Sequence, residues 1–262
     1  MSGDARPECS TCVPLVGPVG VPPAAATGEP ERSGDGQRQT PAGPTAETAV
    51  LHSFGGTPVR KEDQGHGKYV GLKNWGWYLN DLHLWRERFG SDERRRVLEV
   101  GAFDGVSANR MLDAVFRHSK SEVHCIDAFL PDPTTPQVGE QTKGQFEENA
   151  RLGEHERQIY LYEGLSAEVL AWMLAEEGFW ESFDFIYVDG SHQARHVLMD
   201  ATMSWNLLRV GGVIIFDDYE WPHGENEYGR PRTAIDAFET VFSDRLQRVL
   251  SGYRRGFGKL SA

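Results

Sequence analysis

Residues 183–219 read FDFIYVDGSHQARHVLMDATMSWNLLRVGGVIIFDDY, and this stretch decides the fold. Two short apolar runs flank a segment in which apolar residues recur at helical spacing, namely Val197, Ala201, Trp205 and Leu208. An apolar strand, a helix and a second apolar strand are the pattern of a parallel βαβ unit. We therefore predict strands over 183–188 and 211–216, joined by a helix over 192–209.

Both predicted strands end in carboxylates, Asp189 after the first and Asp217-Asp218 after the second. In an open parallel sheet, ligands bind in the crevice outside the carboxyl ends of the strands. We expect the three acids to converge there. Because neighbouring carboxylates repel one another, something positive is expected between them.

A second strand–turn–helix pattern lies upstream, where residues 97–107 read VLEVGAFDGVS and a helix follows to about residue 116. Gly101 and Gly105 allow the backbone to approach a ligand closely, and the helix N-terminus offers free N–H groups. A tight structural turn is the alternative interpretation. The dinucleotide fingerprint needs a third glycine, so a nicotinamide dehydrogenase is disfavoured.

Two further residues are candidates for contact with a nucleoside. Asp127 ends the apolar run 122–127, and an acid at the tip of the second strand can accept hydrogen bonds from both hydroxyls of a ribose. The alternative is that Asp127 only caps a loop. Ser166 opens a helix predicted over 166–177, where it is expected at the N-cap position, and it is also a candidate for contact with an adenine ring.

The remaining patterns complete an α/β domain. Aromatic residues between Trp75 and Phe89 predict a helix that packs on the sheet, with Asn74, Trp75 or Trp77 over a ligand pocket as the alternative. Helices are predicted over 141–152 and 230–242, a strand over 159–162, and a hairpin over 246–253 and 255–260. The sequence thus predicts a doubly wound, Rossmann-like, mostly parallel sheet with helices on both faces and a C-terminal antiparallel edge hairpin.

Composition divides the chain at about residue 66. Residues 1–66 hold nine of the 14 prolines and almost no aromatic residues, so we expect a disordered Pro/Gly-rich tail rather than a cleaved targeting peptide. Residues 67–262 are long enough for one α/β domain. Cys9 and Cys12 form a lone CxxC in the tail, and Cys125 lies in a strand pattern. Neither pattern indicates a disulfide scaffold, so a cytoplasmic setting is expected.

Charge and hydropathy limit the partners. Of 27 basic and 39 acidic residues, 5 and 8 lie in residues 1–66, which leaves 22 and 31 in the predicted domain. An acidic surface repels phosphate backbones, so no nucleic-acid partner is expected. No apolar run approaches the ~20 residues that span a bilayer, so no membrane partner is expected either.

Taken together, these residues resemble the class I S-adenosylmethionine-dependent methyltransferases. Residues 99–107 are similar to the first motif of that superfamily, with Glu99, Gly101, Gly105 and Ser107, and Asp127 is similar to its ribose-binding acid. The pattern Asp189-Gly-Ser-His192 with Asp217-Asp218 resembles the metal-dependent O-methyltransferases, in particular the group that contains macrolide-sugar O-methyltransferases. The resemblance covers about residues 70–255.

The resemblance implies S-adenosylmethionine as methyl donor, with Asp189 also among the cofactor-binding residues. It implies Mg²⁺ or another divalent cation on Asp189, Asp217 and Asp218, and His192 as the base. Catechol-type relatives carry a lysine near that place. The macrolide enzymes have a large additional N-terminal domain that the short tail does not supply, so their oligomeric state need not transfer and a homo-oligomer stays open.

The expected reaction is methylation of a small hydroxylated acceptor, a sugar or a phenol. Coordination to a dication lowers the pKa of a hydroxyl, and an imidazole, which titrates near neutral pH, completes the deprotonation. Aromatic residues follow the carboxylate pair Asp217-Asp218, and they suggest an aromatic acceptor pocket formed by Trp221, His223 and Tyr228. The alternatives are a metal-independent methyltransferase acting on a carboxyl or amine, and a non-catalytic cofactor-binding module.

Overall fold

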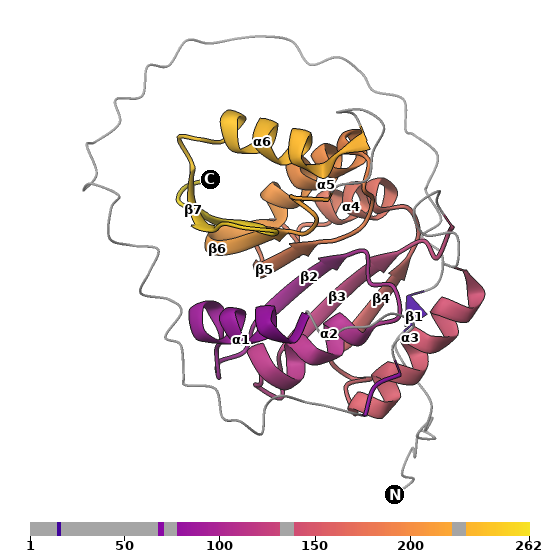
Figure 1. The fold of residues 1–262 in the computed structure, drawn as a ribbon. Helices are drawn as coiled ribbons and strands as arrows, with labels where there is room; N and C mark the ends of the chain where they lie inside the picture. The colour runs from indigo at the N-terminus through magenta and orange to yellow at the C-terminus, as the bar shows by residue number, and fades with distance from the viewer. Residues whose placement is uncertain (1–14, 17–67, 71–77, 132–138, 222–228) are drawn as a thin grey trace, which may run out of the picture.

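The computed structural model describes residues 15–16, 68–70, 78–131, 139–221 and 229–262 (Figure 1). Several predictions of the sequence therefore lie outside the described residues: those for Asn74, Trp75, Trp77, His223 and Tyr228, and those for the tail apart from Leu15–Val16. No helix in the described ranges is long and apolar enough to cross a membrane.

A mixed sheet forms the centre of the protein. Its strands are β1 (Leu15–Val16), β2 (Arg96–Val100), β3 (Glu122–Asp127), β4 (Ile159–Glu163), β5 (Phe183–Val188), β6 (Leu208–Phe216), β7 (Leu246–Leu250) and β8 (Arg255–Lys259). The spatial order is β1-β4-β3-β2-β5-β6-β8-β7. All neighbouring pairs from β1 to β6 are parallel, whereas β8 pairs antiparallel with both β6 and β7. The predicted fold class, including the C-terminal antiparallel hairpin, is confirmed.

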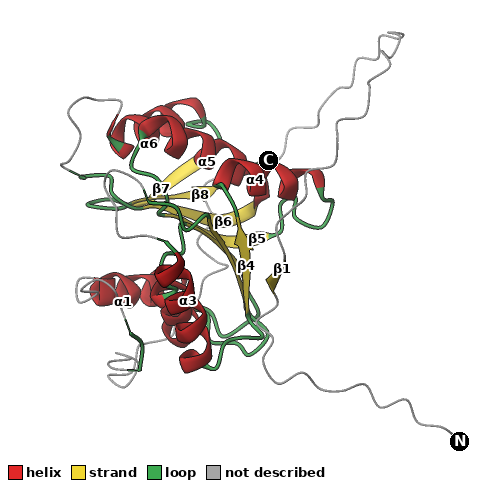
Figure 2. Ribbon diagram, turned by 90° about the vertical axis from the view of Figure 1, so that its right-hand side faces the viewer, coloured by secondary structure: helices red, strands yellow, loops and turns green. Residues whose placement is uncertain are grey.

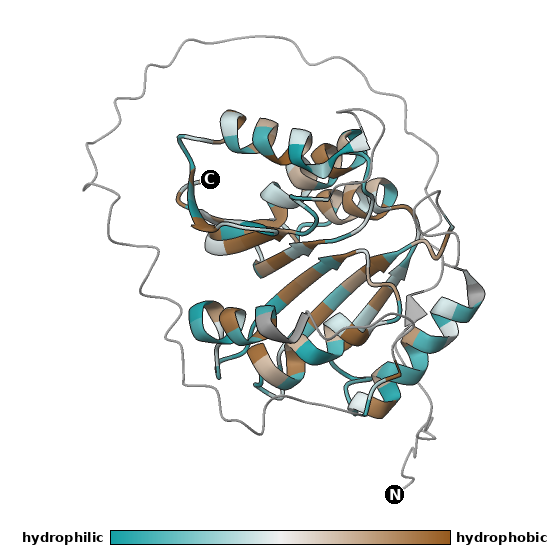
Figure 3. Ribbon diagram, viewed as in Figure 1, coloured by the Kyte–Doolittle hydropathy of each residue, from teal (hydrophilic) through white to brown (hydrophobic). Residues whose placement is uncertain are grey.

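Helices cover both faces of this sheet, as Figures 1 and 2 show. One face carries α1 (Tyr78–Phe89), α2 (Val106–Arg110) with the π-helical turn η2 (Met111–Val115), and α3 (Glu140–Gly153). The other carries α4 (Ser166–Ala175), α5 (Ala194–Leu207) and α6 (Pro231–Val241). Side chains alternate along each strand, so Val97 packs into the first core and Leu98 into the second. Figure 3 shows the central strands as the most hydrophobic part of the ribbon.

Three element boundaries differ from the prediction in the stretch that decides the fold: the start of β6 and both ends of α5, which ends at Leu207 rather than at residue 209. Strand β6 begins at Leu208, three residues before the predicted start, because Leu208 pairs with Phe183 ahead of a register shift that brings Val213 opposite Phe185. Helix α5 begins at Ala194 rather than at His192, with Gln193 as its N-cap. His192 therefore lies in the loop before the helix.

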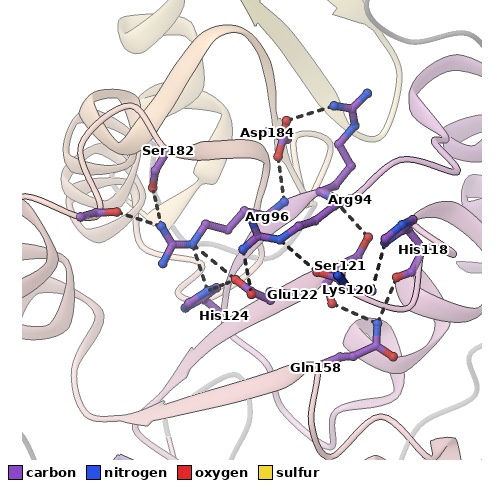
Figure 4. A network of polar contacts seen from close by, with 12 residues as sticks. Arg94, Arg96, His118, Lys120, Ser121, Glu122, His124, Gln158, Ser182 and Asp184 are labelled. Atoms are coloured by element: carbon purple, nitrogen blue, oxygen red, sulfur yellow. Dashed lines mark hydrogen bonds and ion pairs between the residues drawn. The ribbon is translucent and has the colours of Figure 1, made fainter.

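A polar network closes the amino ends of β2, β3 and β5, on the opposite edge from the crevice (Figure 4). Arg94 donates to Glu122 Oε1 at 2.9 Å, and the backbone N–H of Arg96 donates to Asp184 Oδ2 at 2.8 Å. Hydrogen bonds to Glu122, first from His124 and then from Arg94, lower the pKa of this carboxyl to about 2. Arg96 Nε also lies 3.2 Å from His124 Nε2. These contacts give His124 a structural role at this edge of the sheet.

Candidate active site

The site lies where the strand order reverses, between β2 and β5. Chain connections diverge at this point, so a crevice opens at the carboxyl ends of the two strands. Backbone bonds align the strand tips: Asp189 N donates to Val100 O at 2.8 Å, and Asp217 N donates to Val188 O at 3.0 Å. The βαβ pattern therefore does bring Gly101, Asp189 and Asp217 to one edge of the sheet.

The glycine turn after β2 requires its two glycines. Gly101 has φ +91°, and a Cβ atom there would lie 2.2 Å from the carbonyl oxygen of Asp189. Gly105 has φ +73°, and its Cβ would lie 2.7 Å from the ring of Phe146. The first turn thus packs directly against the loop after β5, an approach that only glycine permits at Gly101.

Asp127, at the tip of β3, holds this turn in place. Its Oδ2 accepts a hydrogen bond from Phe103 N at 2.8 Å, and its Oδ1 accepts one from Phe129 N at 2.7 Å. Burial raises the pKa of Asp127 although these backbone bonds oppose the shift. Each oxygen keeps a second lone pair, so the loop-capping role and a role in ligand binding are compatible.

Glu99 is fully buried in the middle of the sheet, in register with Cys125 on β3 and Tyr187 on β5. Its Oε2 is 3.7 Å from the Cys125 thiol, and its Oε1 has no partner with hydrogen-bond geometry among the described residues. Burial raises the pKa of Glu99 to about 8, against the opposing effects of Ser107 and Cys125. Ser107, in α2, is also buried. Both residues thus lie just below the glycine turn.

Ser166 is the first residue of α4, and the N-cap position belongs to Leu165, with no side chain capping the helix. The prediction that Ser166 is the N-cap is therefore wrong. Its hydroxyl instead faces Asp200 of α5. Asp200 is 1% exposed, and burial raises its pKa to about 6. Contact of Ser166 with an adenine ring stays a prediction.

Asp217 is surrounded by hydrogen-bond donors. The hydroxyl of Tyr187 donates to its Oδ2 at 2.5 Å, and Nη2 of Arg254 donates to the same oxygen at 3.0 Å. Its Oδ1 accepts from Asp218 N at 2.8 Å. Burial raises the pKa of Asp217, and the charge of Arg254 is the largest effect that opposes the shift.

Asp218 holds the candidate base. Its Oδ2 lies 2.8 Å from His192 Nε2, and its Oδ1 accepts a hydrogen bond from Tyr253 at 2.8 Å. The indole of Trp221 stacks on the imidazole, with ring centroids 4.4 Å apart and planes 6° from parallel. Asp218 itself adopts φ +58°, a left-handed conformation that is uncommon outside glycine and is found at functional sites.

Asp189 differs from the other two acids, because no hydrogen bond or ion pair joins its side chain to another described residue. Burial raises its pKa well above the ordinary value, and the charges of Asp217 and Asp218 add to the shift. The three carboxylates therefore share one electrostatic environment. Among the described residues, however, no three His, Cys, Asp or Glu side chains lie close enough together to hold a metal ion.

The sequence reasoning missed Arg254, Tyr187 and Tyr253, which contact the carboxylates. Tyr187 appeared only as one of the apolar residues of a buried strand. Tyr253 and Arg254 lie between the two hairpin strands, and their nearness to Asp217 and Asp218 comes from the pairing of β8 with β6. The only local sign of their role was that both Tyr253 and Arg254, which carry polar groups, lie in the short connection of the hairpin.

A doubly wound sheet with a glycine turn and an acid at its switch point defines the fold of the class I S-adenosylmethionine-dependent methyltransferases. Residues 98–219 match a family model described as a methyltransferase domain, and this part of the chain is a methyltransferase domain. The superfamily named from the residues is thereby confirmed. The match reaches from β2 to the residue after Asp218 and so includes the glycine turn and all three carboxylates.

Solved structures share the fold at low sequence identity. A candidate O-methyltransferase from Klebsiella pneumoniae is 17% identical with a TM-score of 0.50, over 83% of this chain and 91% of that one. The O-methyltransferase from Bacillus cereus, in complex with SAH, is 19% identical with a TM-score of 0.49, over 63% and 74% of the chains. MycE from the mycinamycin biosynthetic pathway, in complex with Mg, SAH and mycinamycin VI, is 17% identical with a TM-score of 0.48, over 72% and 50%. No curated protein sequence matches the chain.

Proposed function

We propose that this protein transfers a methyl group from S-adenosylmethionine to a hydroxyl of a small molecule, with His192 as general base. The observation that carries the proposal is the His192–Asp218 pair at 2.8 Å, beside the glycine turn of a methyltransferase domain. A histidine bonded to a buried carboxylate at the ligand-binding edge of the sheet is the arrangement that proton abstraction requires.

The residues present fit the methyl donor. Gly101 lets the turn pack directly against the backbone of Asp189, and Asp127 keeps acceptor capacity for ribose hydroxyls. The unpartnered Oε1 of Glu99 is a buried acceptor that the ammonium group of the methionine moiety would satisfy. S-adenosylmethionine supplies an activated methyl group on a sulfonium, so the protein's contribution is largely positioning.

His192 is well suited to take the acceptor's proton. Asp218 orients the imidazole and stabilises the positive charge that forms when the ring accepts a proton, as carboxylates do beside catalytic histidines. Stacking on Trp221 fixes the plane of the ring. The two contacts leave the imidazole little rotational freedom, which favours transfer at one position of the acceptor.

The type of donor, hard carboxylate oxygens, suits a divalent cation such as Mg²⁺. In the described residues, however, Asp189, Asp217 and Asp218 do not lie close enough together to hold one, so these side chains would have to move to bind it. The raised pKa values of Asp189 and Asp217 reflect carboxylate charges that burial and mutual repulsion disfavour, and a cation would compensate them. A cation held there would lower the pKa of an acceptor hydroxyl.

A cavity that begins at Gln193, the residue after His192 in the chain, is a candidate for the acceptor site. It measures about 570 Å³ and lies between the N-terminal parts of α5 and α6, lined mainly by small or apolar residues, among them Ala194, Leu198, Ala234 and Ala237. The volume is in the range of small-molecule sites. We propose a sugar or phenol whose hydroxyl lies at His192.

One observation favours a second candidate, a metal-independent methyltransferase of the same fold. Arg254 already supplies a positive charge to Asp217 at 3.0 Å, so the cluster is partly neutralised without a metal. Such an enzyme would act on a carboxyl or amine, neither of which needs a dication to become nucleophilic. Turnover that survives EDTA would distinguish this candidate.

Calorimetric titration with S-adenosylmethionine, with and without Mg²⁺, tests the proposal on wild type and Asp217→Ala. We expect the variant to lose metal binding and to keep cofactor binding, because Asp217 belongs to the carboxylate cluster and not to the glycine turn. A wild-type protein that fails to bind S-adenosylmethionine would contradict the proposed function. Retained metal binding in Asp217→Ala would remove that residue from the cation site.

A further inference from the structure

Asn149 joins the glycine turn to a segment that lies well upstream in the chain. It belongs to α3 and is fully buried. Its Oδ1 accepts a hydrogen bond from Val70 N at 2.9 Å, and its Nδ2 donates to Val70 O at 3.0 Å and to Asp104 O at 2.8 Å. Asp104 is the residue before Gly105 in the turn. One side-chain amide thus contacts both the glycine turn and the segment before α1.

This amide uses all of its hydrogen-bonding groups. A side-chain amide has one oxygen and two N–H donors, and the three contacts occupy each of them. If Val70 moved away, two of the three groups would lose their partner inside the protein. A buried polar group without a partner is costly, so the amide would turn toward other partners and release the carbonyl of Asp104.

Lys68 and Tyr69 attach the same segment to Asp113, in η2. Tyr69 Oη donates to Asp113 Oδ2 at 2.6 Å, and Lys68 Nζ lies 3.3 Å from Oδ1. His155 Nε2 also lies 3.0 Å from Oδ1. Residues 68–70, here called the clasp, are therefore tied to η2 by side chains and to α3 by the backbone of the last residue.

The glycine turn needs support from outside. Phe103, in the middle of the turn, has φ +48°, a left-handed conformation that is costly for a residue other than glycine. Such a conformation persists only where the surroundings fix it. Asp127 on β3 accepts from Phe103 N, and Asn149 on α3 donates to the next carbonyl, that of Asp104. The clasp supports the turn through the second of these contacts.

We propose that Asn149 is a positioning residue for methyl-donor binding, and that it makes a docked clasp a condition for tight binding at the glycine turn. The inference rests on the proposed function, because it takes this turn as part of the donor site. Coupling between two sites is reciprocal, so a bound donor must hold the clasp to the same degree that the clasp favours the donor.

Calorimetric titration of the full chain with S-adenosylhomocysteine tests this coupling. We expect Asn149→Ala to weaken binding by about tenfold and Tyr69→Phe by about threefold, since each lowers the fraction of molecules that have a docked clasp. The hydroxyl of Tyr69 contacts Asp113 rather than the turn, so its removal leaves the turn itself unchanged. Tyr69→Phe also carries the test if Asn149→Ala does not fold.

The matched control is Tyr162→Phe. It likewise removes one tyrosine hydroxyl, which lies 3.0 Å from His124 Nδ1, but on the other face of the sheet from the clasp. The affinity for S-adenosylhomocysteine should stay at the wild-type value in this variant.

Hydrogen exchange of the peptide that spans residues 68–70 separates positioning from a structural role. Saturating S-adenosylhomocysteine should slow exchange of the Val70 N–H by about threefold or more in wild type and should have no such effect in Asn149→Ala. A merely structural clasp would lower Tm in the clasp variants and leave both the affinity and the ligand's effect on exchange unchanged.

Unchanged affinity in Asn149→Ala and Tyr69→Phe would overturn the proposal, as would exchange at Val70 that does not respond to the ligand in wild type. Weaker binding in Asn149→Ala alone would also overturn it, because Asn149 would then hold the turn without the clasp. Wild type that fails to bind S-adenosylhomocysteine would contradict the proposed function and this inference together. Normal wild-type binding with no loss in the variants would contradict this inference only.

Discussion

His192 Nε2 lies 2.8 Å from Asp218 Oδ2, and the two residues come from different connections of the sheet. His192 precedes α5, whereas Asp218 follows β6, and the parallel pairing of β5 with β6 brings the two loops together. The pair therefore depends on sheet register. A register slip by one residue would turn the side chains of β6 to opposite faces and separate these groups.

Replacing the base should lower turnover strongly. We expect His192→Ala to reduce kcat by about 10²–10⁴-fold at neutral pH, with partial recovery as pH rises and more of the acceptor ionises by itself. Methyl transfer to an acceptor hydroxyl, followed by formation of S-adenosylhomocysteine across pH 6–10, measures the effect. The control is His196→Ala, which changes a histidine bonded to Ser191 instead. An unchanged rate in His192→Ala would remove this residue from the mechanism.

The glycine turn should not tolerate a methyl group at its first position. In Gly101→Ala the new Cβ would lie 2.2 Å from the Asp189 carbonyl oxygen, and φ +91° adds strain. We expect at least about 100-fold weaker S-adenosylmethionine binding by calorimetry, because the turn must move to relieve the contact.

Gly144 provides the control for that substitution. It lies in α3, and a Cβ atom there would meet nothing within 4 Å. Gly144→Ala should keep cofactor affinity and raise stability by about 0.5–1 kcal/mol, since alanine is the better helix former. Normal cofactor binding by Gly101→Ala would show that this turn does not touch the ligand.

Glu99 should make the ligand-free protein less stable as pH rises. Its pKa is about 8 in the folded protein against 4.5 as the ordinary value. An acid whose pKa is raised in the folded protein stabilises the fold fully below its unfolded-state pKa of 4.5. This stabilisation is lost as the pH rises through the folded-state pKa of about 8. Glu99→Gln, which mimics the protonated acid, should flatten this part of the Tm profile between pH 5 and 9. Exposed Glu177→Gln serves as control, and parallel profiles for wild type and Glu99→Gln would contradict the assignment.

Asp200 should behave in the same way at lower pH. In the part of the chain that the structure describes, neither of its carboxylate oxygens has a partner with hydrogen-bond geometry, and its pKa of about 6 lies above the ordinary 3.8. We expect Asp200→Asn to stabilise the protein by about 3 kcal/mol at pH 8 and by little at pH 4, where the wild-type acid is protonated. Urea unfolding at both pH values measures this. Asp244→Asn, a change at a largely exposed residue, should show no such difference, and equal gains at both pH values would rule out ionisation as the cause.

The sequence by itself determined the order of elements and the edge of the sheet that carries the chemistry. Short apolar runs bounded by carboxylates identify buried parallel strands, because such strands are apolar on both faces. Because the carboxyl ends of parallel strands lie at the same edge of a sheet, Asp189, Asp217 and Asp218 are placed at that edge independently of how the helices pack. The first residues of α5 and β6, Ala194 and Leu208, differ from the prediction. Strand β6 starts before Gly211-Gly212 because Leu208 pairs with Phe183 across the sheet.

Only the tertiary structure decided what surrounds those acids. Arg254 lies 37 residues beyond Asp217 in the chain, and Asp81 lies 173 residues before Arg254. No local pattern predicts such contacts, because they arise from the pairing of β8 with β6 and from the packing of α1 on one face of the sheet. The types of residue at the site follow from local sequence, whereas the charges that balance them follow from long-range packing.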